Sequence, residues 1–181
     1  MIEMAIKIGI TGPVGSIKAE ALQKIIGMLQ NDGLNVQGVL ISKVSDDGKL
    51  TGYTIEDILT KKKVQFCDEK FVSRVKIDKL GVDTRLLEEI LIPSLQKARE
   101  SADVIIIDEV GKLENTTKKI HSEIEETLKC GKPLIVTLHK RSRNPVLQEI
   151  KSLEGVRVFD ITPINKNILP FKVMHVLKGE E

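Results

Sequence analysis

Aromatic residues are scarce in this sequence, making up 3% of its 181 residues with no tryptophan among them. Few rings are therefore available to stack on nucleic-acid bases. The net charge is only +2 although 30% of the residues are charged, so the two signs are interspersed and no strongly basic surface is expected. Both deficits argue against nucleic acid as a principal partner.

Long hydrophobic runs and cysteines are also rare. No apolar run approaches the roughly 20 residues that cross a bilayer. The N-terminal segment also lacks the basic, apolar and small-residue succession of a secretory signal. We therefore expect no membrane partner and a cytoplasmic location. Cys67 and Cys130 are far apart and lack metal-ligand spacing, which favours two buried free thiols over a disulfide or a metal site.

Strand-like apolar runs alternate with helical spacings along the whole chain. The pattern predicts strands at 4–10, 36–44, 103–109, 133–138 and 156–161, and helices at 18–29, 84–100, 116–129, 145–153 and from 169. Pro93 lies inside the second helix and is expected to kink or divide it. Turn residues and alternating segments over 46–75 predict an inserted antiparallel hairpin. The sequence thus predicts one α/β domain over 1–181, with three layers and a mostly parallel sheet.

A glycine-containing segment follows the first predicted strand. It reads Gly12-Pro13-Val14-Gly15-Ser16-Ile17-Lys18-Ala19, whereas a phosphate-binding loop reads G-x-x-x-x-G-K-[ST]. Gly12 and Lys18 match that pattern, but Ile17 replaces the second glycine and Ala19 replaces the hydroxyl residue. The main-chain amides at the start of a helix bind phosphate whatever the neighbouring side chains. We therefore interpret this segment as an altered phosphate loop, with Lys18 as its catalytic cation.

Two carboxylates, Asp108 and Glu109, end the most apolar strand of the chain. By themselves they are better explained as a polar strand end and helix cap. However, the carboxyl ends of parallel strands meet at one edge of a sheet, so this pair is expected to share a crevice with the altered loop. There Asp108 is predicted to hold Mg²⁺, and Glu109 to orient or deprotonate the attacking water. The two motifs together favour a nucleotide site.

The chain resembles the THEP family of small P-loop nucleoside-triphosphatases. The segments that carry the resemblance are "DVIIIDEVGKLE" (103–114), 75–103, "GYTIEDI" (52–58), 138–151 and 160–170. The resemblance implies a RecA-like α/β core that hydrolyses several nucleoside triphosphates with Mg²⁺. It also implies that Asp108 and Glu109 are the family's acidic-strand carboxylates.

The phosphate loop departs from the family's pattern, G-x-x-G-x-G-K-T-T, at three positions. Ile17 is β-branched and restricts the backbone where amides point at phosphate oxygens. Ala19 offers no hydroxyl to Mg²⁺, and Glu20 adds a negative charge near an anion site. We expect nucleotide binding to persist with slower turnover, because Lys18 and the main-chain amides remain.

Three further places are candidates for contact with the nucleotide. Arg141, in the basic segment 139–143, either contacts the γ-phosphate or belongs to a solvated loop. Lys112 either neutralises phosphate charge or pairs with Glu114. The resemblance also suggests that the segment 165–166 contacts the base.

Two functions of different kind remain open. One is Mg²⁺-dependent hydrolysis of nucleoside triphosphates, and the alternative is nucleotide binding with little or no hydrolysis. A small nucleotide kinase is a less favoured third reading, because such enzymes usually carry an arginine-rich lid and the insertion at 46–75 contains only Arg74.

Overall fold

The computed structural model describes residues 6–12, 16–139, 145–153 and 155–180, without the side chains of 16, 139 and 145–147. Within these residues the chain forms a nine-stranded sheet in the order β5-β6-β4-β3-β2-β7-β8-β1-β9. The strands are β1 Lys7–Gly12, β2 Val36–Asp46, β3 Lys49–Asp57, β4 Lys63–Asp68, β5 Lys76–Ile77, β6 Leu80–Val82, β7 Val104–Ile107, β8 Leu134–His139 and β9 Val156–Asp160.

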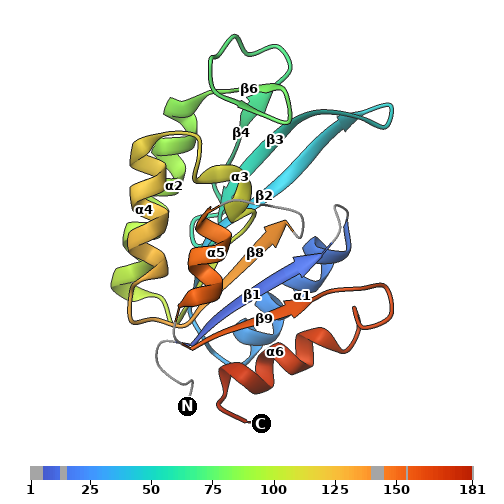
Figure 1. Cartoon of the computed structure of the whole chain (residues 1–181), viewed down its shortest axis with the longest axis vertical. Coiled ribbons are helices and arrows are strands. Elements are labelled where there is room, and N and C mark those ends of the chain that lie inside the picture. Colours follow the sequence, from blue (N-terminus) through green and yellow to red (C-terminus); the bar gives the residue numbers. More distant parts are fainter. Residues whose placement is uncertain (1–5, 13–15, 140–144, 154, 181) are drawn as a thin grey trace.

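Helices cover both faces of this sheet (Figure 1). They are α1 Ser16–Asn31, α2 Thr84–Ser101, α3 Val110–Leu113, α4 Lys118–Leu128, α5 Pro145–Ser152 and α6 Leu169–Leu177. One core lies under α2, α4 and α5, and the other lies under α1 and α6. Strand β7 serves both cores, because Ile105 and Ile107 face the first while Val104 and Ile106 face the second. The predicted three-layer α/β fold is therefore confirmed.

The sheet is half parallel and half antiparallel. Strands β2, β7, β8, β1 and β9 form the predicted parallel part, and β3, β4, β6 and β5 add antiparallel neighbours. The antiparallel excursion was predicted over 46–75 but continues to Val82. It begins with a two-residue turn at Asp47 and Gly48, both at positive φ (47° and 77°), which is the Asp-Gly signature of a tight hairpin.

One helix prediction needs correction, and another is confirmed to within two residues at each end. The helix around Pro93 is not divided, since α2 runs unbroken from Thr84 to Ser101 with Pro93 on its exposed side and a leucine- and isoleucine-rich face in the core. The helix predicted at 116–129 is preceded by the separate short helix α3, and α4 begins after Thr117, whose side chain accepts a hydrogen bond from the Ile120 N–H. Tertiary packing holds α2 together across the proline, and an N-cap residue defines the start of α4.

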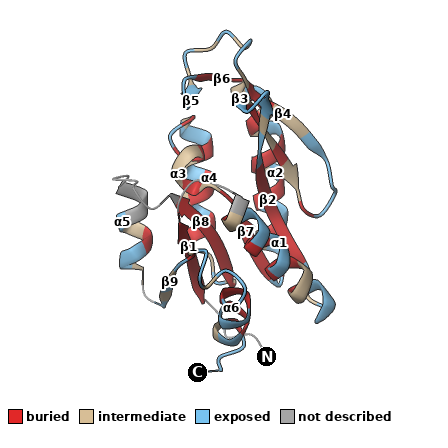
Figure 2. Ribbon diagram, turned by 90° about the vertical axis from the view of Figure 1, so that its right-hand side faces the viewer, coloured by how far each residue is buried: buried red, intermediate tan, exposed pale blue. Residues whose placement is uncertain are grey.

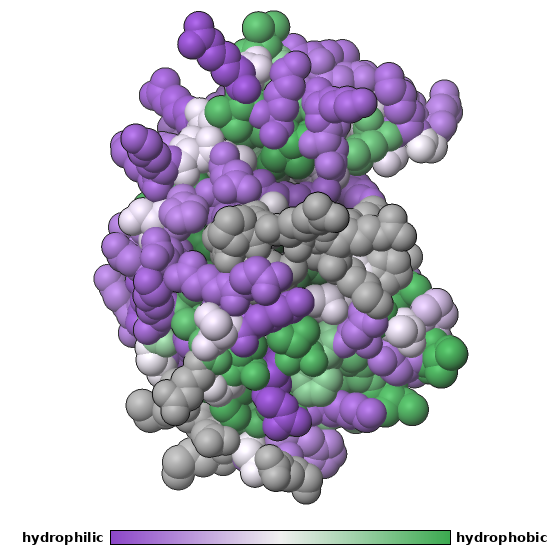
Figure 3. Space-filling view, viewed as in Figure 1, coloured by the Kyte–Doolittle hydropathy of each residue, from purple (hydrophilic) through white to green (hydrophobic). Residues whose placement is uncertain are grey.

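Buried residues concentrate in four of the five parallel strands, β1, β2, β7 and β8, as Figure 2 shows, whereas β9 holds none. Hydrophilic side chains cover much of the side where α2 and α4 lie, and exposed hydrophobic ones appear both at the top and in the lower half of the view (Figure 3). Both cysteines are free as predicted, Cys67 buried and Cys130 half-buried. Among the described residues no helix combines the length and apolar character that a membrane crossing requires.

Candidate functional site

The order of the parallel strands brings the two sequence motifs to one edge of the sheet. Strand β8 lies between β7 and β1, pairing Ile107 of β7 with Val136 and Gly12 of β1 with His139. The chain leaving β7 therefore faces the chain leaving β1 across the end of β8. Of the two motifs, the described residues Gly12 and those that directly follow β7 therefore lie at the same edge of the sheet.

Lys18 lies in the first turn of α1 and is only 4% exposed. Its Nζ donates a hydrogen bond to the Leu138 carbonyl at the end of β8, at 3.2 Å. The same Nζ lies 3.6 Å from Oε1 of Glu109. The ammonium of Lys18 thus contacts both the end of β8 and the segment that follows β7.

Gly12 ends β1 where another segment approaches it closely. A Cβ at this position would lie 2.6 Å from Cγ2 of Ile161 and 3.1 Å from its carbonyl oxygen. The Ile161 N–H also donates to the Thr11 carbonyl, at 2.7 Å. Glycine is therefore required here because the chain leaving β9 packs against the start of the loop.

Asp108 is a buried carboxylate, 8% exposed, held by two donors. Its Oδ2 accepts the Ile41 N–H at 2.9 Å, and its Oδ1 accepts the hydroxyl of Thr137. Burial raises the pKa of Asp108 to about 6; the charge of Glu109 acts in the same direction, and the two hydrogen bonds oppose it. The ionised form is costly at this position, so a cation beside it would be favourable.

Glu109 has a left-handed backbone, with φ 56° and ψ 49°, directly before α3. Its N–H donates to Oγ1 of Thr137 at 2.8 Å, and its carbonyl accepts the Lys112 N–H at 3.0 Å. A residue other than glycine pays about 1–2 kcal/mol for this conformation. The sharp turn directs the Glu109 carboxylate, 20% exposed, toward Lys18.

The loop residues that depart from the phosphate-loop pattern differ in how far they are buried. Ile17 is half-buried and packs against the core under α1 and α6. Ala19 and Glu20 are exposed on α1. The predicted contacts of residues 13–15 lie outside the described residues, and Ser16 is described by its backbone alone. Ile17 therefore has a packing role of its own.

Lys112 is held by the antiparallel part of the sheet. Its Nζ donates to Oδ2 of Asp78 at 2.5 Å and to the Tyr53 hydroxyl at 3.1 Å. Burial favours a raised pKa for Asp78, but the hydrogen bonds from Lys112 and Tyr53 outweigh it and hold that pKa below its usual value. For Lys112 itself, burial acts to lower the pKa and the bonds to Asp78 and Tyr53 raise it above its usual value. The Lys112 ammonium thus pairs with Asp78, whereas the sequence analysis predicted a phosphate or Glu114 as its partner.

Two predicted contacts with the nucleotide remain, Arg141 and the segment 165–166. Arg141 lies outside the described residues. Asn165 organises the turn after β9, where its side chain accepts the Thr162 N–H and donates to the Asp160 carbonyl, each at 2.8 Å. Lys166 beside it is exposed.

Thr137 is a residue of the site that sequence reasoning missed. It is 1% exposed in the middle of the apolar strand β8. Its hydroxyl donates to Asp108 and accepts from the Glu109 N–H. The available signal was a lone hydroxyl in the run "PLIVTL", since a buried polar side chain needs a partner.

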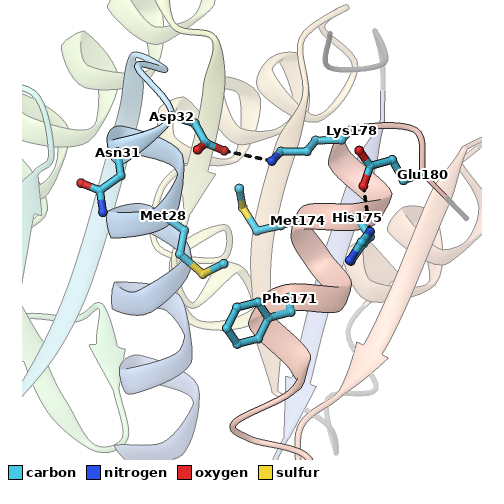
Figure 4. Close-up of a pocket in the computed structure, with 8 residues that line it drawn as sticks. All are labelled: Met28, Asn31, Asp32, Phe171, Met174, His175, Lys178 and Glu180. Carbon is cyan, nitrogen blue, oxygen red and sulfur yellow. Dashed lines mark ion pairs between the residues drawn. The ribbon is translucent and has the colours of Figure 1, made fainter.

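A separate cavity of about 340 Å³ lies between the end of α1 and α6. Figure 4 shows Met28, Phe171 and Met174 in it, with the ion pairs Asp32–Lys178 (3.1 Å) and His175–Glu180 (2.8 Å) on one side. None of the site residues described above lines this cavity.

The fold and the site define a P-loop NTPase: the lysine of a helix that follows β1 faces an acidic pair at the end of a neighbouring parallel strand. Comparison with known proteins specifies the class further. The family model described as NTPase matches residues 7–174. The chain therefore belongs to the NTPase family, the family of the THEP1 nucleoside-triphosphatases.

The relatives match along nearly their whole lengths. Nucleoside-triphosphatase THEP1 of Thermoplasma acidophilum is 87% identical over 181 residues, which is 100% of both chains. The protein of that name from Picrophilus torridus is 66% identical over 176 residues, covering 97% of this chain and 98% of the relative.

Two solved structures share the fold. The crystal structure of THEP1 from Aquifex aeolicus matches with a TM-score of 0.82 at 27% identity, covering 96% of this chain and 99% of the other. The solution structure of a human cancer-related nucleoside triphosphatase matches with a TM-score of 0.80 at 22% identity, covering 97% and 99%. At 22% identity the human protein supports the fold alone.

Proposed function

We propose that this protein hydrolyses nucleoside triphosphates to the diphosphate and phosphate, with Mg²⁺, at the edge formed by β1, β8 and β7. The observation that carries the proposal is the meeting of Lys18 and Glu109, 3.6 Å apart, beside the buried Asp108. Membership of a family of nucleoside-triphosphatases supports the substrate class.

Each charged group has a distinct role in this proposal. Lys18 provides positive charge for the phosphates, and the first amides of α1 provide hydrogen-bond donors for them. Glu109 orients the attacking water and takes its proton, since it is the more exposed of the two carboxylates. The residues assigned to nucleotide contact are those of the altered loop, Gly12 to Ala19, together with Asp108 and Arg141.

The donor set fits a magnesium ion that arrives with the nucleotide. Mg²⁺ usually binds through one or two carboxylates, phosphate oxygens and water rather than in an all-protein cage. Among the described residues no group of three or more His, Cys, Asp or Glu side chains is arranged to hold a metal. Asp108 is one such carboxylate, and a cation offsets the cost of its burial. When bound, the ion would neutralise phosphate charge.

The alternative, nucleotide binding with little hydrolysis, is favoured by one observation. Ile17 and Ala19 occupy the positions of the flexible glycine and the metal-binding hydroxyl, and the half-buried side chain of Ile17 fixes the backbone there. Phosphate release from ATP, GTP and CTP with and without Mg²⁺, beside a nucleotide-binding titration, separates the two functions. Turnover supports the hydrolase, and binding without release supports the alternative.

Two substitutions test the assigned roles. Asp108→Asn is expected to weaken binding of the Mg²⁺–nucleotide complex, because it removes the charge that holds the metal. Glu109→Gln is expected to leave binding nearly intact and abolish hydrolysis, because its carboxylate acts only in the transition state. Hydrolysis by Glu109→Gln at the parent rate would show that Glu109 is not the base.

A further inference from the structure

We propose that Thr137 is a positioning residue for the reaction, because its hydroxyl fixes the Asp108 carboxylate and the Glu109 backbone at the same time. The role rests on the proposed hydrolysis, but the contacts themselves do not. The two residues follow β7, and Thr137 reaches them from the neighbouring strand β8.

The hydroxyl of Thr137 is used in both of its capacities. It donates its one hydrogen to Oδ1 of Asp108, and it accepts the N–H of Glu109 at 2.8 Å. Thr137 is 1% exposed, so water has little access to replace either bond. Removing the hydroxyl therefore leaves two buried polar groups with one partner fewer, which costs more than the bonds themselves contribute.

The second bond matters because the Glu109 backbone is strained. Its left-handed conformation is held from both sides, by Thr137 at the N–H and by the Lys112 N–H at the carbonyl. Loss of the first support allows the backbone to relax, and the carboxylate then moves away from Lys18. Displacements of about 1 Å in a catalytic group lower rates by roughly 100-fold.

A matched buried threonine shows what a purely structural hydroxyl looks like. Thr127 in α4 is fully buried, donates to the Glu123 carbonyl and accepts from Arg99, each at 2.8 Å. None of these partners belongs to the strand ends that form the site. Thr127→Val therefore reports the general cost of losing a buried hydroxyl.

The experiment compares Thr137→Val, Thr137→Ser and Thr127→Val in the full-length protein. We expect Thr137→Val to lower kcat for Mg²⁺–ATP hydrolysis roughly 10- to 100-fold. KM is expected to rise much less than kcat falls, because Asp108 keeps its hydrogen bond from the Ile41 N–H. Thr137→Ser restores the hydroxyl and is expected to return kcat to within about threefold of the parent. Thr127→Val is expected to lower stability with kcat unchanged.

Hydrogen exchange of the Glu109 amide gives a second readout that needs no hydrolysis. Its protection should fall in Thr137→Val and persist in Thr137→Ser and Thr127→Val. A parent protein without turnover would refute the proposed hydrolysis, and the exchange measurement would still test the contact. Unchanged kcat and unchanged protection in folded Thr137→Val, or a serine variant as slow as the valine variant, would overturn the role of Thr137.

Discussion

The left-handed backbone of Glu109 predicts an unusual order of stability between two substitutions. Glu109→Ala and Glu109→Gly both remove the carboxylate and its contact with Lys18. They differ only in that alanine keeps a Cβ, which is unfavourable at φ 56° and ψ 49°. The difference between the two variants therefore isolates the backbone conformation from the lost ion pair.

The magnitude follows from two opposing terms. The left-handed conformation costs alanine about 1–2 kcal/mol relative to glycine. Glycine loses about 0.4–1 kcal/mol more conformational entropy on folding. Glu109→Gly should thus be the more stable variant by roughly 0.5–1 kcal/mol, which for a chain of this length corresponds to about 1–4 °C in Tm.

The assay is thermal unfolding followed by circular dichroism, with Gln96 as the control position. Gln96 is exposed inside α2, where Gln96→Ala should be more stable than Gln96→Gly by about 1 kcal/mol. The order of alanine and glycine should therefore reverse between the two positions. If Glu109→Ala is at least as stable as Glu109→Gly, the strained backbone and its part in directing the carboxylate are refuted.

Two further predictions concern the altered loop and the ion pair between Lys112 of α3 and Asp78. Ile17→Gly combined with Ala19→Thr should raise Mg²⁺-dependent hydrolysis at least about tenfold, a barrier change of roughly 1.4 kcal/mol; an unchanged rate in a folded variant would show that the departures are harmless. Lys112→Met should lower the free energy of unfolding at pH 7 by about 1 kcal/mol, since Asp78 is partly exposed. Because the pKa of Asp78 in the folded protein lies below its usual value, that difference should be fully present at neutral pH and be lost as the pH falls below the usual carboxyl pKa and through the folded-state pKa. Urea unfolding at pH 7 and pH 3 tests it, and an equal difference at both would contradict the contact.

Local patterns were enough to predict most of the fold. The apolar run ending in Asp108 and Glu109, the helical spacing after Lys18 and the Asp-Gly turn at 47–48 each depend on neighbours in the chain. Their meeting at one edge followed from the general rule that parallel strands present their carboxyl ends together.

The contacts that could not be predicted from the sequence join residues that are distant in the chain. Thr137 lies 29 residues from Asp108, and Lys112 lies 34 residues from Asp78. Each contact exists only because particular strands or turns become neighbours, β8 beside β7 in the first case. The backbone of Glu109 was also not predictable, because a non-glycine residue adopts the left-handed region when its surroundings hold it there.

The charges at the edge formed by β1, β8 and β7 explain why the proposed hydrolysis requires a metal ion. Lys18 carries one positive charge and faces two carboxylates, Asp108 and Glu109, so these three side chains sum to one negative charge when all are ionised. A nucleoside triphosphate carries several negative charges of its own and is repelled by that sum. A divalent cation held by Asp108 would reverse the sign of this interaction, and it would also offset the burial that raises the pKa of Asp108 to about 6. Ala19 supplies no hydroxyl, so Asp108 is the only metal ligand that the proposal assigns among the described residues. The departures from the loop pattern at Ile17 and Ala19 should therefore impair the positioning of the metal, and so lower turnover. They should affect nucleotide binding by Lys18 and the amides of α1 less.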